Sequence, residues 1–313
     1  MLDLKCKWDT EYRGNWAGVM DHKSFLKTLN ANDKARLNAR SDAQGLRHLM
    51  LYCAVLGVTG SWIFFALPLW HIMMIPHGIL IAFLFTLQHE CTHNTPFKTH
   101  WLNSVVGHVI AFLLFQPFLW FRYFHLAHHK YTNIAGKDPE LDGHEKPASW
   151  GAFLRHLSTV DYWWAKITKL IGNSVGPLTA SYIPPRKRRV LRAEAVLLIV
   201  AYAGVFAMAP TALLWLWIVP LILGFPVLRL YLLAEHGRCP EVEDMFLNTR
   251  TTLTTRLVRF LAWNMPYHAE HHAMPSVPFH KLPTLHDMTA AHLGQVSDGY
   301  SDFSKEYVSS FRD

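Results

Sequence analysis

HLAHH, at residues 125–129, places three histidines at positions i, i+3 and i+4. Two related clusters occur in the same chain, HECTH at residues 89–93 and HAEHH at residues 268–272. On an α-helix these spacings put every histidine of a cluster on one face, about one turn apart. Neutral imidazole is a good ligand for iron, zinc and copper, so three such clusters in one chain predict a shared metal site.

The chain around the clusters is apolar enough to lie in a membrane. It has 313 residues, of which 51% are hydrophobic and 17% charged. A transmembrane helix needs roughly 20 apolar residues, and four segments approach that length, at about 48–67, 71–88, 191–208 and 211–233. The net charge of +7 is typical of basic residues that meet anionic lipid, and we expect no binding of nucleic acid. The composition therefore predicts an all-α polytopic membrane protein.

The distribution of lysine and arginine predicts how the chain is oriented. The connectors at Pro68–Leu69 and Ala209–Pro210 contain neither residue, whereas basic residues occur in the N-terminal segment, the middle region and the C-terminal region, including Arg186–Arg189. The positive-inside rule then puts both termini and the middle region in the cytoplasm. We expect four transmembrane helices in two hairpins, with a cytoplasmic helical cap that holds the metal site.

A fifth apolar stretch, Val105–Trp120, lies between the first two histidine clusters. If it crossed the bilayer, those clusters would lie on opposite faces, roughly 30 Å apart. Metal ligands must lie near 2 Å from their ion, so one shared site excludes a simple span here. We therefore expect a re-entrant or interfacial helix that turns near Pro117.

The number of histidines indicates the kind of metal site. Eight ligands are too many for one ion, but they suit two ions with four or five histidines each. Redox iron fits such a set better than structural zinc, although ligand softness leaves zinc and copper open. His236, at the cytoplasmic end of the last span, is a candidate ninth ligand, and Asn264, one turn before His268, is a candidate that faces a metal directly or through water. For other histidines, such as His48, His77 and His286, we expect hydrogen-bonded structural roles.

Carboxylates near the clusters are candidates to support the ligands. A ligating histidine commonly donates its second N–H to a carboxylate, which fixes the ring and raises its basicity. We expect this role for Asp138, Glu235 and Glu270.

HECTH also matches HExxH, the zinc-protease motif, with Leu141-Asp142-Gly143 downstream. An intramembrane zinc metalloprotease is thus an alternative of a different class, but it leaves HLAHH, HAEHH and His236 without a role. A transporter would place polar ligands inside its spans, whereas these clusters fall at the ends of the spans.

The three motifs in this order resemble the histidine boxes of the membrane fatty acid desaturase and hydroxylase superfamily, whose members hold non-haem diiron. The flanking strings HLAHHKYTN (125–133) and NMPYHAEHHAMPSVPF (264–279) are similar as well. The resemblance covers roughly residues 45–290. Membrane alkane hydroxylases have a different second box, and stearoyl-CoA desaturases have a longer first box. Bacterial acyl-lipid desaturases and small-substrate oxygenases of the superfamily are therefore a better match.

The resemblance implies that the box histidines and His236 ligate two iron ions, with no catalytic residue apart from the ligands. It implies oxidation of an unactivated C–H bond by O2, as desaturation or hydroxylation of a lipid or alkyl chain. A small non-lipid metabolite is an alternative substrate. Electrons would come from an external ferredoxin, cytochrome or reductase. We expect an N-terminal segment (1–45), a catalytic domain (46–290) and a C-terminal tail (291–313), in a bacterial inner membrane. The ligands expected in the site are His89, His93, His125, His128, His129, His236, His268, His271 and His272.

Overall fold

The structure, a computed structural model, describes residues 20–142 and 146–311, and it is predominantly helical. Residues 1–19 of the predicted N-terminal segment and residues 312–313 of the predicted tail lie outside the described residues. The long helices and their neighbours are α4 (Asp42–Phe64), α5 (Trp70–His93), α6 (His100–Leu113), α7 (Phe118–Tyr131), α8 (Trp150–Leu157), α9 (Val160–Val175), α10 (Arg188–Met208), α11 (Pro210–Leu213), η2 (Leu214–Ile218) and α12 (Val219–His236).

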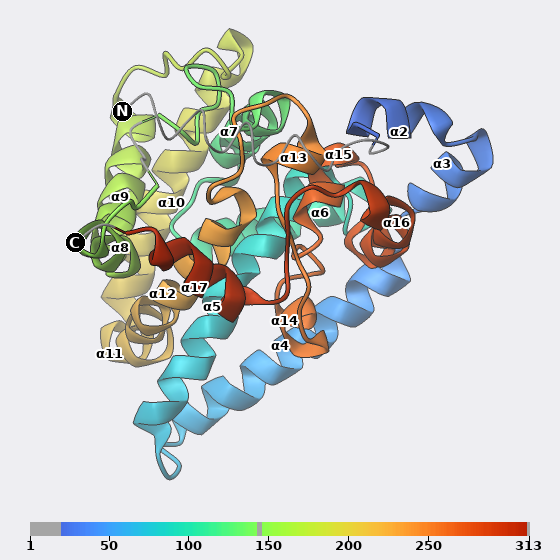
Figure 1. The fold of residues 1–313 in the computed structure, drawn as a ribbon. Coiled ribbons are helices and arrows are strands. Elements are labelled where there is room, and N and C mark those ends of the chain that lie inside the picture. The colour runs from blue at the N-terminus through green and yellow to red at the C-terminus, as the bar shows by residue number, and fades with distance from the viewer. Residues whose placement is uncertain (1–19, 143–145, 312–313) are drawn as a thin grey trace.

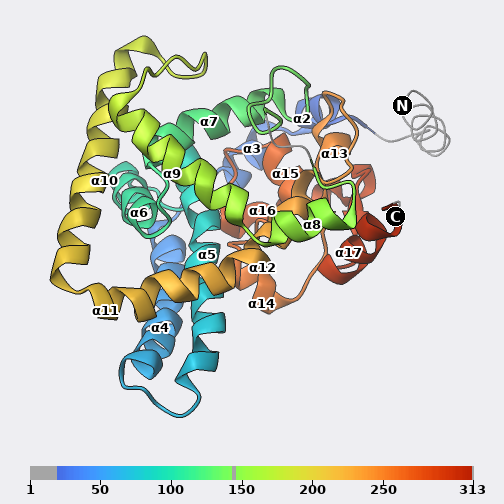
Figure 2. The same ribbon diagram turned by 90° about the vertical axis from the view of Figure 1, so that its left-hand side faces the viewer.

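Four helical stretches are long and apolar enough to cross a membrane, and they coincide with the four predicted spans. They include α4, α5, α10 and the run from α11 through η2 to α12. α4 and α5 form one hairpin, and α10 and α12 form the second, with α12 crossing α5 (Figures 1 and 2). His48 and His77 have the expected structural roles, because His48 Nε2 lies 2.9 Å from the Phe260 carbonyl and His77 Nδ1 lies 2.7 Å from Thr59 Oγ1.

The fifth apolar stretch is not one straight helix. α6 and α7 meet at an angle of 104°, and Phe115 between them has a φ of +54°. Pro117 precedes the first turn of α7, where the backbone N–H of Phe118 donates to Glu194 Oε1 of α10 at 2.8 Å. A carboxylate at a helix N-terminus satisfies free N–H groups and the helix dipole. The bend turns α7 back, so that it lies against α5.

α5 and α12 cross with their backbones in contact. A Cβ atom placed on Gly78 of α5 would lie 1.7 Å from the carbonyl oxygen of Pro220, and one placed on Gly224 of α12 would lie 2.1 Å from the carbonyl carbon of Gly78. Small residues allow such close approach of membrane helices. This crossing sets the relative position of two helices that each end in a site histidine.

We expect Gly78→Ala to destabilise the protein, because the added methyl group meets a backbone that cannot move aside. Overpacking of this kind costs about 1–3 kcal/mol, and we expect the upper part of that range. The matched control is Gly57→Ala on α4, where an added Cβ meets nothing within 4 Å. Thermal unfolding of the two detergent-solubilised variants measures the difference, and equal stability would contradict a tight crossing.

Short elements cover one end of the helical hairpins (Figure 1). The two strands pair in parallel, with Thr251 opposite Val296. Among them, the HAEHH helix α15 lies against the ends of α5, α7 and α12. The short elements are α2 (His22–Thr28), α3 (Ala31–Leu37), η1 (Pro185–Lys187), α13 (Met245–Asn248), β1 (Thr251–Thr252), α14 (Arg256–Leu261), α15 (His268–Ala273), η3 (Phe279–Lys281), α16 (Leu282–Thr289), η4 (Ala290–His292), β2 (Val296–Ser297) and α17 (Tyr300–Ser309).

Candidate metal centre

All nine histidines predicted as ligands lie together where four helices meet. The last turn of α5 carries the HECTH pair, α7 carries HLAHH, α15 carries HAEHH, and α12 ends at His236. Eight of the nine side chains are buried, and His93 is partly buried. The helical spacing therefore brings the histidines of each cluster to one face, as predicted, and the three faces point to the same interior region.

The nine histidines divide into two adjacent groups. The first group contains His89, His93, His125, His129 and His271. The second contains His128, His236 and His272, and within each of these two sets one ring nitrogen per residue lies within 4.8 Å of the others. His268 joins the second group, because its Nε2 lies 3.2 Å from Nε2 of His236 and 3.1 Å from Nε2 of His272. The division into five and four agrees with two ions that take four or five histidines each.

The inward ring nitrogens have the spacing of metal ligands. The Nε2 atoms are 2.7 Å apart for His89 and His271, and 3.0 Å apart for His93 and His125. Two ligands at right angles on an ion with bonds of about 2.1 Å lie about 3.0 Å apart. Neither ring nitrogen of the buried His129 has a hydrogen-bond partner within residues 20–142 and 146–311, although a buried polar group normally has one. A metal ion in each group fits both observations.

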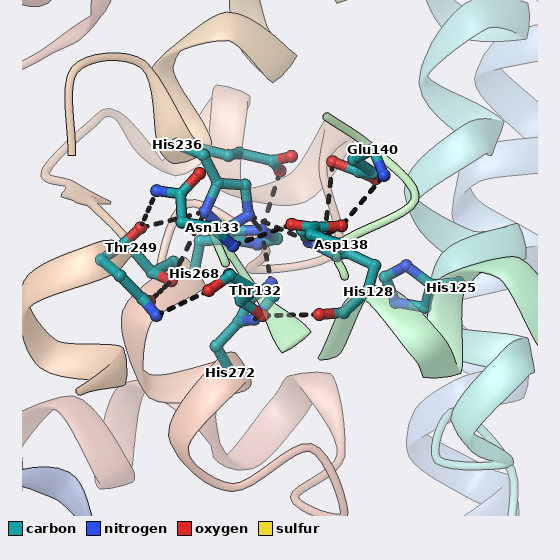
Figure 3. A network of polar contacts seen from close by, with 12 residues as sticks. His125, His128, Thr132, Asn133, Asp138, Glu140, His236, Thr249, His268 and His272 are labelled. Carbon is teal, nitrogen blue, oxygen red and sulfur yellow. Dashed lines mark hydrogen bonds and ion pairs between the residues drawn. The ribbon is translucent and has the colours of Figure 1, made fainter. Parts of the chain in front are cut away.

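The outward ring nitrogens of three histidines lie within hydrogen-bond distance of the surrounding protein (Figure 3). Nδ1 of His128 is 2.9 Å from Asp138 Oδ1, and Nδ1 of His272 is 3.0 Å from Thr132 Oγ1. Nδ1 of His236 is 3.2 Å from the carbonyl oxygen of Asn248. Such contacts fix the tautomer and the ring orientation, so that Nε2 is left as the free ligand atom.

Burial keeps most of these rings neutral, which is the form that binds a metal. It holds the pKa of His271 and His272 on α15 well below the usual range, and nearby histidines lower it further. Burial also acts to lower the pKa of His128, but Glu140 and the hydrogen bond with Asp138 outweigh it and raise that pKa. His128 therefore differs from His271 and His272, because neighbouring carboxylates favour its protonated form.

The predicted supporting residues fall into two sets. Asp138 contacts His128 as expected, and Glu235 Oε1 lies 3.5 Å from His268 Nδ1. The structure corrects the predicted role of Glu270, because its carboxylate contacts His286 Nδ1 and Thr251 Oγ1, each at 2.5 Å, instead of a box histidine. The structure also corrects the prediction that Asn264 faces a metal. Its amide donates to the carbonyl of Phe279 at 3.0 Å, and its φ of +57° places it in a tight turn.

Sequence reasoning missed three supporting groups. Glu90 Oε1 lies 3.5 Å from His271 Nδ1, and its other oxygen accepts from Thr95 Oγ1 and from the backbone of Phe279. Thr132 and the carbonyl of Asn248 are the other two. Glu90 directly follows the candidate ligand His89 within HECTH. That position is the only feature of the sequence that could have indicated its supporting role.

We expect Asp138→Asn to weaken metal binding about 10–100-fold, the usual cost of losing such a partner. The amide keeps the shape but not the charge that orients His128. Asp142→Asn, at an exposed position four residues on, is the control and should bind metal as the unchanged protein does. Titration of the two variants with Fe²⁺ measures the difference, and equal affinities would argue against a role for Asp138 in the centre.

Apolar helices of membrane-spanning length and nine convergent histidines define a membrane protein with a multi-histidine site. A family model described as fatty acid desaturase matches residues 65–304. The chain belongs to the fatty acid desaturase family.

Curated relatives of this chain are named as lipid desaturases. It is 24% identical over 253 residues to an sn-1 oleoyl-lipid 12-desaturase of Picosynechococcus sp., which covers 74% of this chain and 70% of the relative. It is 25% identical to an sn-1 acyl-lipid omega-3 desaturase (ferredoxin) of Nostoc sp., over 74% of this chain and 69% of the relative. A third relative, an oleoyl-lipid 12-desaturase of Anabaena variabilis, is 26% identical over 71% of this chain and 56% of its own length.

These relatives indicate lipid desaturation, and they give no support to the zinc-protease alternative. The geometry agrees, because the two HExxH histidines belong to a group of five and Glu90 between them is fully buried. Asp142 is exposed and belongs to neither histidine group, and Gly143 lies outside the described residues.

Proposed function

We propose that this protein is an O2-dependent diiron membrane oxidoreductase that introduces a double bond into an acyl or alkyl chain. The observation that carries the proposal is the convergence of nine histidines into two adjacent groups in a member of the fatty acid desaturase family. The groups of five and four would each hold one iron. Bound iron supplies the activation of O2 that removes hydrogen from an unactivated C–H bond.

Hydrogen bonds of neighbouring residues hold the histidine-bearing segments in place. Lys146 Nζ donates to the carbonyl of His236 at 2.6 Å and to Asn133 Oδ1 at 3.0 Å. Asn133 Nδ2 in turn donates to the carbonyl of Asn248 at 2.9 Å. These bonds tie the end of α12 to the segment that follows α7 and to the last residue of α13, so His236 stays aligned with the histidines of α7 without the metal. Close positioning of the substrate carbon and the metals decides which hydrogen is removed.

Apolar rings would exclude water from the side of the centre that faces α5 and α7. The ring of Phe121 stacks on His125, with centroids 5.4 Å apart, and lies 5.3 Å from the ring of Phe85. A dry site strengthens the electrostatic control of the reaction and suppresses side reactions. We assign Phe85 and Phe121 to the wall along which the substrate chain lies.

Membrane orientation and the electron donor belong to the same proposal. The lack of basic residues in the two hairpin connectors supports cytoplasmic termini and a cytoplasmic metal centre, as in a bacterial inner membrane. The Nostoc relative is named as a ferredoxin enzyme, and we propose a ferredoxin-type donor for this chain. The exposed residues Arg186–Arg189 at the start of α10 are suited to an acidic carrier, because opposite charges speed association.

Lipid analysis tests the proposal. We expect cells that express the protein to accumulate lipid chains that have lost two hydrogen atoms, as measured by mass spectrometry, and cells that express an inactive His129→Ala variant to lack them. The purified protein should contain two iron ions per chain. Chains that gain an oxygen atom would instead identify a hydroxylase. Unchanged lipids would point to the small-metabolite alternative.

A further inference from the structure

Two cationic side chains face one aromatic ring between α9, α12 and the turn that joins α6 to α7. Lys166 Nζ of α9 lies 4.9 Å from the centroid of the Tyr162 ring, and the Arg229 guanidinium of α12 lies 5.2 Å from the same centroid. Lys166 also donates to Gln116 Oε1. Lys166 is thus turned inward from α9, toward the bundle.

Neither cation forms an ion pair in the part of the chain that the structure describes. In residues 20–142 and 146–311, no carboxylate lies within salt-bridge distance of Lys166 or Arg229. Burial, aided by the Arg229 guanidinium, holds the pKa of Lys166 well below its usual range, although the more distant Glu140 carboxylate acts to raise it. Both side chains are half-buried, and a cation that is withdrawn from water without a partner is costly, so proteins normally pair it or neutralise it.

The surroundings of Lys166 also contain more hydrogen-bond donors than acceptors. The hydroxyl of Tyr162 competes with Lys166 for Gln116 Oε1, at 3.5 Å. Gln116 is fully buried, and its Nε2 has no hydrogen-bond partner among the described residues. The same holds for the buried atoms Nε1 of Trp163 and Nε of Arg229, although Nη2 of Arg229 lies 3.0 Å from Nδ1 of His156. The free donors of Gln116 and Trp163, together with the cations Lys166 and Arg229, form an environment that an anion would satisfy.

This donor-rich region lies one aromatic ring away from the first histidine group. The ring of Phe121 is 5.9 Å from Lys166 Nζ, and the same ring stacks on His125 of the first histidine group. On the other side, the Gln116 carbonyl accepts from Gln88 Nε2 at 3.0 Å, and Gln88 immediately precedes the ligand candidate His89. A chain that starts at Lys166 would have to pass Phe121 to reach the metal centre.

We propose that Lys166 and Gln116, with added charge from Arg229, form a subsite for the anionic group of the substrate, a carboxylate or a phosphate. This inference rests on the proposed function, since it assigns the substrate of that same centre. The substrate class is then an acyl or alkyl chain that carries an anion. Fixing that anion at Lys166 would determine which carbon lies beside the histidines.

Binding of matched eight-carbon probes tests the subsite. Octanoate, octyl phosphate and methyl octanoate are titrated into the iron-loaded protein in lipid nanodiscs by calorimetry. We expect at least one of the two anions to bind about tenfold or more tightly than the neutral ester, because a buried charge-assisted hydrogen bond is lost with the ester. The tighter anion identifies the source, a free acid or a phosphate ester.

Variants remove or occupy the subsite. Lys166→Met should abolish the preference for anions, whereas Lys169→Met, at an exposed position one turn along α9, should retain it. Gln116→Glu supplies an internal carboxylate to Lys166, so we expect a folded protein that binds the ester but no longer prefers anions. The subsite is refuted if the unchanged protein binds ester and anions equally, or if Lys166→Met and Gln116→Glu keep the preference. Because binding needs no turnover, a failed lipid analysis with the preference intact would refute only the oxidation.

Discussion

Replacing His129 by alanine is expected to abolish oxidation while leaving the fold intact. His128, His236 and His272 each have a hydrogen-bond partner outside the histidine set. Neither nitrogen of His129 has such a partner among the residues that the structure describes. The ring is buried and stacks on His272 with centroids 4.0 Å apart. Alanine therefore removes a ligand of the five-histidine group without breaking a hydrogen bond. We expect turnover to fall by more than about 100-fold, the upper range for loss of a partner outside the ligand set.

The measurements for this variant are iron content and product formation. Iron should fall from two ions per chain to about one, while the thermal unfolding temperature of the metal-free protein stays near that of the unchanged protein. His100→Ala, at an exposed position at the start of α6, is the matched control and should keep both irons and activity. Retained activity in an iron-poor His129→Ala protein would exclude the diiron proposal.

The histidine clusters could be predicted from the sequence because the face of a helix that they occupy depends only on local spacing. A helix brings positions i, i+3 and i+4 to one face whatever surrounds it, so HLAHH and HAEHH define their own faces. The apolar spans were readable for the same reason, since length and composition suffice. His236 belongs to no cluster, so its prediction needed the topology as well. The predicted spans put the end of the last span at the same membrane depth as the three clusters.

The bend between α6 and α7 was predicted from a constraint rather than from composition. Hydropathy alone favours a fifth span over Val105–Trp120, but a shared site excludes it. The structure adds what sequence could not supply, the Glu194 carboxylate of α10 that receives the N-terminus of α7. That contact joins residues 76 positions apart, and no local pattern indicates it.

The supporting carboxylates show the limit of sequence reasoning. Glu90 and Glu270 each lie within a histidine cluster, and the cluster alone does not say which one faces a ligand. Glu90 lies beside His271 because α5 and α15 meet at the centre. Glu270 points away from the box histidines and contacts Thr251 of β1 and His286 of α16. Side-chain partners across helices depend on how the helices pack, which the spacing of residues within one helix does not determine.

Replacing His236 by alanine is the second change from which we expect a large effect. His236 lies between two members of the four-histidine group, with its Nε2 3.2 Å from Nε2 of His128 and 3.2 Å from Nε2 of His268. Its removal leaves three histidines, and a group of three holds a metal less firmly than a group of four. We expect loss of one iron per chain and a fall in turnover of more than about 100-fold.

The control for His236 must separate ligation from packing at the end of α12. His286→Ala also removes a hydrogen-bonded histidine, whose Nδ1 is 2.5 Å from Glu270 Oε1, but His286 belongs to neither group. We expect His286→Ala to keep two irons per chain and His236→Ala to keep one. If His236→Ala retains both irons, the second ion is held by His128, His268 and His272 alone, and His236 only shapes the centre. Iron loss in both variants would instead mean that the packing around α15 controls occupancy.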